Sequence, residues 1–97
     1  MYLIHVRLCR PADGEPLAEM PGKILSEALP GEGVEHATVH RLSGREVVVG
    51  LFLRLDGLAV AEETALGVCS RVLDRHAAGG FAVVSASAVP IWPFLDL

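Results

Sequence analysis

The chain of 97 residues contains no asparagine, no glutamine and only one lysine, and it has only two cysteines. Cys9 and Cys69 lie far apart and form no CxxC motif, which excludes a disulfide framework and the common zinc and redox motifs. Both thiols are therefore expected to be free, in a reducing and cytoplasmic setting. The missing Asn and Gln fit the composition of a GC-rich bacterial genome.

Long apolar runs and basic clusters are also missing. No run reaches the roughly 18 residues that a membrane span needs, and Met1 leads directly into a predicted strand, so no signal peptide is expected. The net charge is −4, with 12 acidic and 8 basic residues. A nucleic-acid-binding domain normally carries a basic patch. The composition therefore argues against both a membrane and a nucleic-acid partner.

Apolar residues, by contrast, are abundant. Hydrophobic residues make up 52% of the chain and charged residues 21%. This composition and length predict one globular domain over residues 1–97. A small domain with surplus apolar side chains often buries them in an interface between copies. The aromatic ending 90–97, with Trp92 and Phe94, is predicted to be an apolar arm that docks on its own domain or on a partner.

Hydrophobic periodicity predicts an alternation of strands and helices. The predicted elements are a strand over 2–9, a helix over 17–29, strands over 34–42 and 46–55, a helix over 59–78 and a strand over 81–89. The core face of the first helix is predicted to hold Leu17, Met20, Ile24, Ala28 and Leu29. The apolar stripe of the second helix is predicted to hold Ala61, Ala65, Val68, Cys69, Val72, Leu73 and His76. This βαββαβ order resembles the ferredoxin-like fold, an α+β architecture. The resemblance implies a four-stranded antiparallel sheet with both helices on one face.

The other face of such a sheet is bare, and no assignment of the strands makes it cleanly polar. The strand over 46–55 places Val48, Gly50 and Phe52 opposite its core side. The last strand offers either a row of alanines or Phe81, Val83 and Val89. A bare apolar face is most simply covered by the same face of a second copy, so a homodimer is predicted.

That arrangement resembles the dimeric α+β barrel superfamily, which includes antibiotic-biosynthesis monooxygenases and muconolactone isomerases. The first strand, "YLIHVRL", is similar to the first strand of the muconolactone isomerase group, which also places a histidine and a basic residue there. The resemblance implies a cavity beside the open sheet face that takes small, often aromatic molecules, with no cofactor.

Two histidines, His36 and His40, raise the question of a site. With a two-residue loop at Ser43-Gly44 they would lie under the helices. With a three-residue loop and a left-handed Gly44, His36 faces Phe52, Thr38 faces Gly50 and His40 faces Val48. The second register is favoured, because two histidines under the helices would need buried polar partners.

Three interpretations of the histidines remain open. They are partly exposed or lie in a dimer interface without chemistry, or His5, His36 or His40 acts as a hydrogen-bonding group or general base in a cavity, or the three together bind a metal. Residues i and i+4 of a strand are roughly 13 Å apart, too far for one ion without the partner chain, so the metal signal is weak and no metal site is predicted. The predicted ligand-binding residues are His5, Arg7, His36, Gly50 and Phe52.

Arg7 is the most unusual charge of the predicted sheet. It is expected to pair with Glu46 or Asp96, or to meet an anionic ligand. No GxSxG elbow is present, and Gly31, Gly33 and Gly79-Gly80 precede strands, which indicates turns and caps rather than a phosphate loop. The sequence therefore predicts a homodimeric module that binds a small apolar or aromatic molecule without catalysis. The alternative is a cofactor-independent monooxygenase or isomerase with a histidine base.

Overall fold

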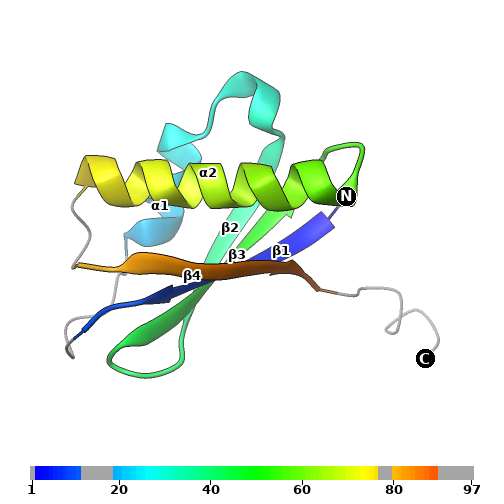
Figure 1. Cartoon of the computed structure of the whole chain (residues 1–97). Helices are drawn as coiled ribbons and strands as arrows, with labels where there is room; N and C mark the ends of the chain where they lie inside the picture. The colour runs from blue at the N-terminus through cyan, green and yellow to red at the C-terminus, as the bar shows by residue number, and fades with distance from the viewer. Residues whose placement is uncertain (1, 12–18, 77–79, 90–97) are drawn as a thin grey trace.

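The computed structural model describes residues 2–11, 19–76 and 80–89, which form an α+β domain (Figure 1). Its four strands form one antiparallel sheet in the order β2-β3-β1-β4. The elements in chain order are β1 (Tyr2–Cys9), α1 (Met20–Glu27), the 3-10 helix η1 (Pro30–Glu32), β2 (Val34–Arg41), β3 (Glu46–Leu53), α2 (Leu58–His76) and β4 (Ala82–Ala88).

Both helices lie on the same side of the sheet (Figure 1). The long helix α2 runs over β4 and β1, and the short helix α1 lies over β2. This architecture is compatible with the ferredoxin-like order of elements. Neither of these two helices is long and apolar enough to cross a membrane. The predicted arm 90–97 lies outside the described residues.

The core lies between the helices and one face of the central strands. Strand residues point alternately to opposite faces, and every second residue of β1 and β3 is apolar and buried. The buried strand residues are Ile4, Val6, Leu8, Val47, Val49, Leu51 and Leu53. Helix α2 covers them with the stripe that its sequence predicts, which comprises Ala61, Ala65, Val68, Cys69 and Val72.

The register between β2 and β3 is the one that the three-residue loop predicts. His36 lies opposite Phe52, Thr38 opposite Gly50 and His40 opposite Val48, which confirms this prediction. The predicted left-handed Gly44 is wrong, because Gly44 is not among the glycines with a positive φ. The Ser43 hydroxyl shapes the turn instead, since Ser43 Oγ accepts hydrogen bonds from the backbone N–H groups of Arg45 and Glu46.

Arg10, just after β1, forms hydrogen bonds that hold the β2–β3 hairpin against the rest of the sheet. Its backbone N–H donates to the Arg45 carbonyl (2.9 Å), and its Nε donates to the Gly44 carbonyl (2.9 Å). Its guanidinium carbon lies 4.5 Å from the centre of the Phe81 ring, a cation–π distance. Arg10 is only 8% exposed, so the β2–β3 turn is held by a buried, charge-assisted contact.

Two predictions about packing are wrong. The spacing that placed Leu29 on the core face of a helix fails, because α1 ends at Glu27 and Leu29 is 55% exposed. Leu29 precedes Pro30 and is therefore extended (φ −90°, ψ 155°).

The second concerns β4. The register of β4 shifts between the residues that pair with Arg7 and Leu8. Its open-face side chains therefore come partly from one predicted alternating set and partly from the other. Val83, Ala86 and Ala88 all pack against the core, so Ser85 and Ser87 are left opposite Arg7 and His5 on the other face. The contribution of β4 to that face is therefore neither of the two that the sequence suggested.

Replacing Arg10 should show how much the hairpin anchor contributes. We expect Arg10→Ala to lower the free energy of unfolding by about 1–3 kcal/mol, because a buried carbonyl loses its charged donor. The matched control is Arg41→Ala, since Arg41 also donates to a loop carbonyl, that of Ser43, but is exposed. The control should change stability by less than about 0.5 kcal/mol. Equal effects in urea unfolding would show that Arg10 has no anchoring role.

Cys69 should make stability pH-dependent. Both cysteines are free, as predicted, and burial raises the pKa of the Cys69 thiol from 9.0 to about 12. Between these pH values the unfolded chain loses the thiol proton while the folded chain keeps it. The free energy of unfolding should therefore fall by about 1.4 kcal/mol per pH unit above pH 9. Cys69→Val should lose this part of the slope, and parallel curves for both proteins would contradict the assignment.

Candidate functional site

The sheet face away from the helices, called the open face below, consists of four rows of side chains that run across the strands. From one end of the sheet to the other, the rows are His36–Phe52–Leu3, then Thr38–Gly50–His5–Ser87, then His40–Val48–Arg7–Ser85, and finally Glu46–Cys9–Ala82. The central strands contribute the apolar Leu3, Val48 and Phe52 to this face, but also His5 and the charged pair Arg7–Glu46. The edge strands carry mainly histidine, threonine and serine.

The second row is built around Gly50. A Cβ atom at position 50 would lie 2.6 Å from Thr38 Oγ1 and 3.6 Å from both His5 Cδ2 and Leu3 Cδ1. Only glycine therefore lets the Thr38 side chain lie across β3, because a methyl group would occupy the same space. The Thr38 hydroxyl and the His5 ring border one spot as a result. Ser87 follows next to His5, so hydrogen-bonding groups line this row on both sides of Gly50.

The first row is aromatic. The rings of His36 and Phe52 contact each other with their centres 5.9 Å apart and their planes tilted by 47°, and Leu3 lies on the other side of Phe52. Phe52 and Leu3 give this row an apolar surface beside the polar second row. An aromatic ring packed on Phe52 would therefore have hydrogen-bonding groups within one row of it.

The histidines do not form a metal centre in the part of the chain that the structure describes. No group of three or more His, Cys, Asp or Glu side chains lies close enough there to hold an ion. His36 and His40 lie two rows apart, opposite Phe52 and Val48. They are single side chains at the edge of the open face, and His5 is the histidine that lies inside it.

Arg7 pairs with Glu46, one of the two partners that the sequence suggested. Arg7 Nε donates to Glu46 Oε2 over 2.9 Å, and both side chains are partly exposed. Such a pair contributes about 0–1 kcal/mol to stability. Together with Cys9 and Val84, the pair lines an open hollow of about 290 Å³. The Cys9 thiol donates to the Arg10 carbonyl (3.7 Å).

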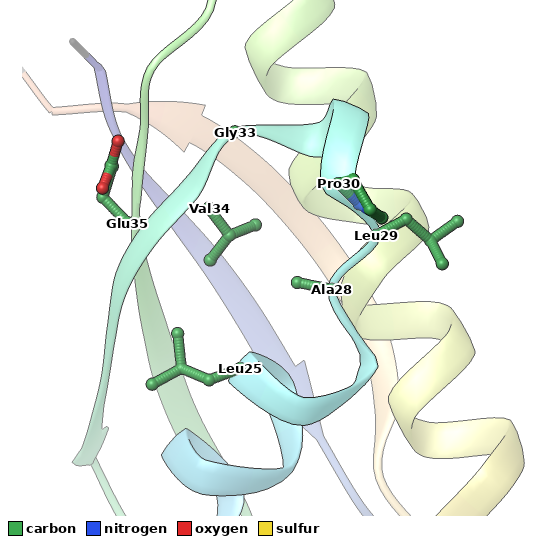
Figure 2. A pocket seen from close by; sticks show the side chains of 7 residues that line it. All are labelled: Leu25, Ala28, Leu29, Pro30, Gly33, Val34 and Glu35. Atoms are coloured by element: carbon green, nitrogen blue, oxygen red, sulfur yellow. The ribbon is translucent and has the colours of Figure 1, made fainter.

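A second hollow, of about 370 Å³, lies on the helix side of the sheet at the edge of β2 (Figure 2). Leu25, Ala28 and Val34 surround the gap between α1 and β2, and Glu35 points away from it (Figure 2). The Glu35 carboxylate pairs with Arg54 (3.1 Å). Gly33 closes the hollow with φ +70°, where a Cβ would lie 2.6 Å from the Arg54 carbonyl oxygen. Gly33 is thus a turn glycine, as the sequence indicated.

The open face therefore holds every residue that the sequence proposed for a site. His5, Arg7, His36, Gly50 and Phe52 occupy its first three rows. Sequence reasoning did not propose Thr38 and Ser87 as site residues. Thr38 was detectable, because the favoured register placed it opposite Gly50. Ser87 was not, because its face depends on the register shift in β4.

No protein-family model, no curated protein and no solved structure matches this chain. The assignment of a site therefore rests on the geometry of the open face.

The contact of Thr38 with Gly50 can be tested by adding one methyl group. We expect Gly50→Ala to lower the free energy of unfolding by about 1–3 kcal/mol, because Thr38 is stiff at χ1 and must move. The control is Gly67→Ala in α2, where nothing lies within 4 Å and alanine favours the helix. It should raise stability by about 0.4–1 kcal/mol.

A double-mutant cycle links the cost to Thr38 itself. Removing the hydroxyl and methyl groups in Thr38→Ala should recover most of the loss in the double variant. Additive losses in the two single variants would show that Gly50 is required for another reason.

Proposed function

We propose that the chain is a ferredoxin-like homodimer of the dimeric α+β barrel kind, which binds a small aromatic or apolar molecule at its open face. The observation that carries the proposal is the layout of that face. Leu3, Val48 and Phe52 lie on the two central strands, and the edge strands supply His36, His40, Ser85 and Ser87. Protein interfaces commonly combine apolar side chains of this kind with hydrogen-bonding and charged ones, here His5, Arg7 and Glu46 on the central strands.

The size and charges of the face support a second copy as its cover. Four strands about 4.8 Å apart and about 26 Å long give a face of roughly 500 Å². Two copies would bury about 1,000 Å², which reaches the lower limit of specific interfaces. The open face carries Arg7 and Glu46 side by side. Each copy therefore presents both a positive and a negative side chain. Two copies related by a two-fold axis can match opposite charges across the interface, so the face can be complementary to itself.

The second row supplies the space for a ligand. Packed sheets lie about 10 Å apart, a distance that ordinary side chains fill. The Thr38 side chain lies over the buried Gly50, and Ser87 is small, so two such rows facing each other leave a shallow space above Thr38, His5 and Ser87. The Thr38 hydroxyl and the His5 ring border that space, and Phe52 supplies an aromatic wall. A neutral aromatic molecule with one polar group matches this lining.

Mutations on the two sides of the sheet test the dimer. In light scattering at micromolar concentration we expect the native protein to be an oligomer. Phe52→Glu should weaken its association at least about 10-fold, because a charge replaces the largest apolar side chain of the face. The control is Val60→Glu, since Val60 is 51% exposed on α2, and it should associate as the native protein does. A monomeric native protein, or one unaffected by Phe52→Glu, would overturn the dimer.

Titration with indole tests the ligand site. In amide NMR spectra, millimolar indole should shift the signals of Thr38, Gly50 and Phe52 and leave Gly67 unchanged. Loss of the shifts in His5→Leu would tie binding to the second row. No shift at these residues would overturn the proposed ligand class. Slow chemical conversion of an aromatic compound that stops in His5→Gln would favour the alternative, an enzyme with His5 as its base.

A further inference from the structure

The strand β4 forms one edge of the sheet, and it differs from the opposite edge in its chemistry. Its seven residues, "AVVSASA", contain no charge and no proline. The opposite edge, β2, carries the ionisable side chains Glu35, His36, His40 and Arg41, all exposed. Single-domain proteins usually protect an exposed sheet edge with charged residues or proline, because its free backbone groups can pair with another chain. In this domain β2 has that protection and β4 does not.

The direction of the free backbone groups of β4 follows from one hydrogen bond. The Val89 N–H donates to the Leu3 carbonyl over 2.8 Å, so Val89 turns its polar backbone groups toward β1. In an antiparallel pair, alternate residues turn these groups to the same side. Ser87 therefore also faces β1, whereas Ala86 and Ala88 direct their N–H and C=O groups away from it. The register shift of β4 lies beyond Ser85, so this stretch is regular.

We propose that β4 pairs with β4 of a second copy, antiparallel and about a two-fold axis at Ser87. Ala86 then lies opposite the partner's Ala88, and the two outward residues of each copy exchange four backbone hydrogen bonds. The two sheets become one sheet of eight strands.

The second copy fits this edge because a two-fold axis places each residue against its own kind or a close neighbour. Around Ser87 these are alanines and serines, so no like charges meet and no large side chain stands between the strands. Small hydroxyl residues opposite each other also form favourable cross-strand pairs. The same operation at β2 would bring its histidines and charged side chains together. The edge pairing is independent of the open-face dimer, and the two axes together would produce a tetramer with D2 symmetry.

Hydrogen exchange in the native protein tests the edge pairing without any substitution. The Leu42 N–H donates to the Glu46 carbonyl, so by the same alternation Val39 and Arg41 direct their amides away from β3. They are the matched control at the other edge. We expect the amides of Ala86 and Ala88 to exchange at least about 10-fold more slowly than those of Val39 and Arg41. Equally fast exchange at both edges would overturn the proposal.

The oligomer masses of two variants distinguish the β4–β4 interface from the open-face dimer. Ala86→Pro removes an N–H that points away from β1 and pairs with no described residue, and it adds a ring at the edge, a position where proline is tolerated. If the native protein is a tetramer, Ala86→Pro and Phe52→Glu should each halve its mass. If it is a dimer, dissociation by Ala86→Pro alone supports the edge pairing and overturns the open-face dimer. Dissociation by Phe52→Glu alone, or a mass unchanged by Ala86→Pro, overturns the edge pairing.

Discussion

The register between β2 and β3 is the constraint on which the rest of the open face depends. A shift of one residue would move every side chain of β2 to the opposite face. The turn fixes the register through the Ser43 hydroxyl and the buried Arg10, whose Nε holds the Gly44 carbonyl. Because of this register Thr38 meets Gly50 and His36 meets Phe52. A small polar turn thus decides that His36 and His40 lie outside the core.

Much of the fold follows from periodicity. The strong alternation in β1 and β3 and the apolar stripe of α2 identify both the elements and their buried faces. The sequence signal fails where a local backbone event interrupts the period. Pro30 makes Leu29 extended and turns a predicted core residue outward. The register shift in β4 combines two faces that alternation treats as separate.

The candidate site was predictable in part for the same reason. Residues on regular strands, such as His5, Gly50 and Phe52, were assigned to one face by alternation alone. The requirement for glycine at position 50 was harder to predict, because it comes from the Thr38 side chain on a neighbouring strand. Contacts between strands depend on register and not on spacing along the chain. For Ser87, the register shift in β4 meant that the sequence alone could not assign the side chain to the open face.

The helices cover one side of the sheet and leave the other side uncovered in the single chain, and we propose that this open face packs against a second copy. The most direct test is an isotope-filtered NMR experiment on an equal mixture of labelled and unlabelled chains. If the open faces pack together, protons of Leu3, Val48 and Phe52 in different copies should give intermolecular contacts. If contacts between copies were observed only from residues of α1 and α2, the open face would not be the interface between copies.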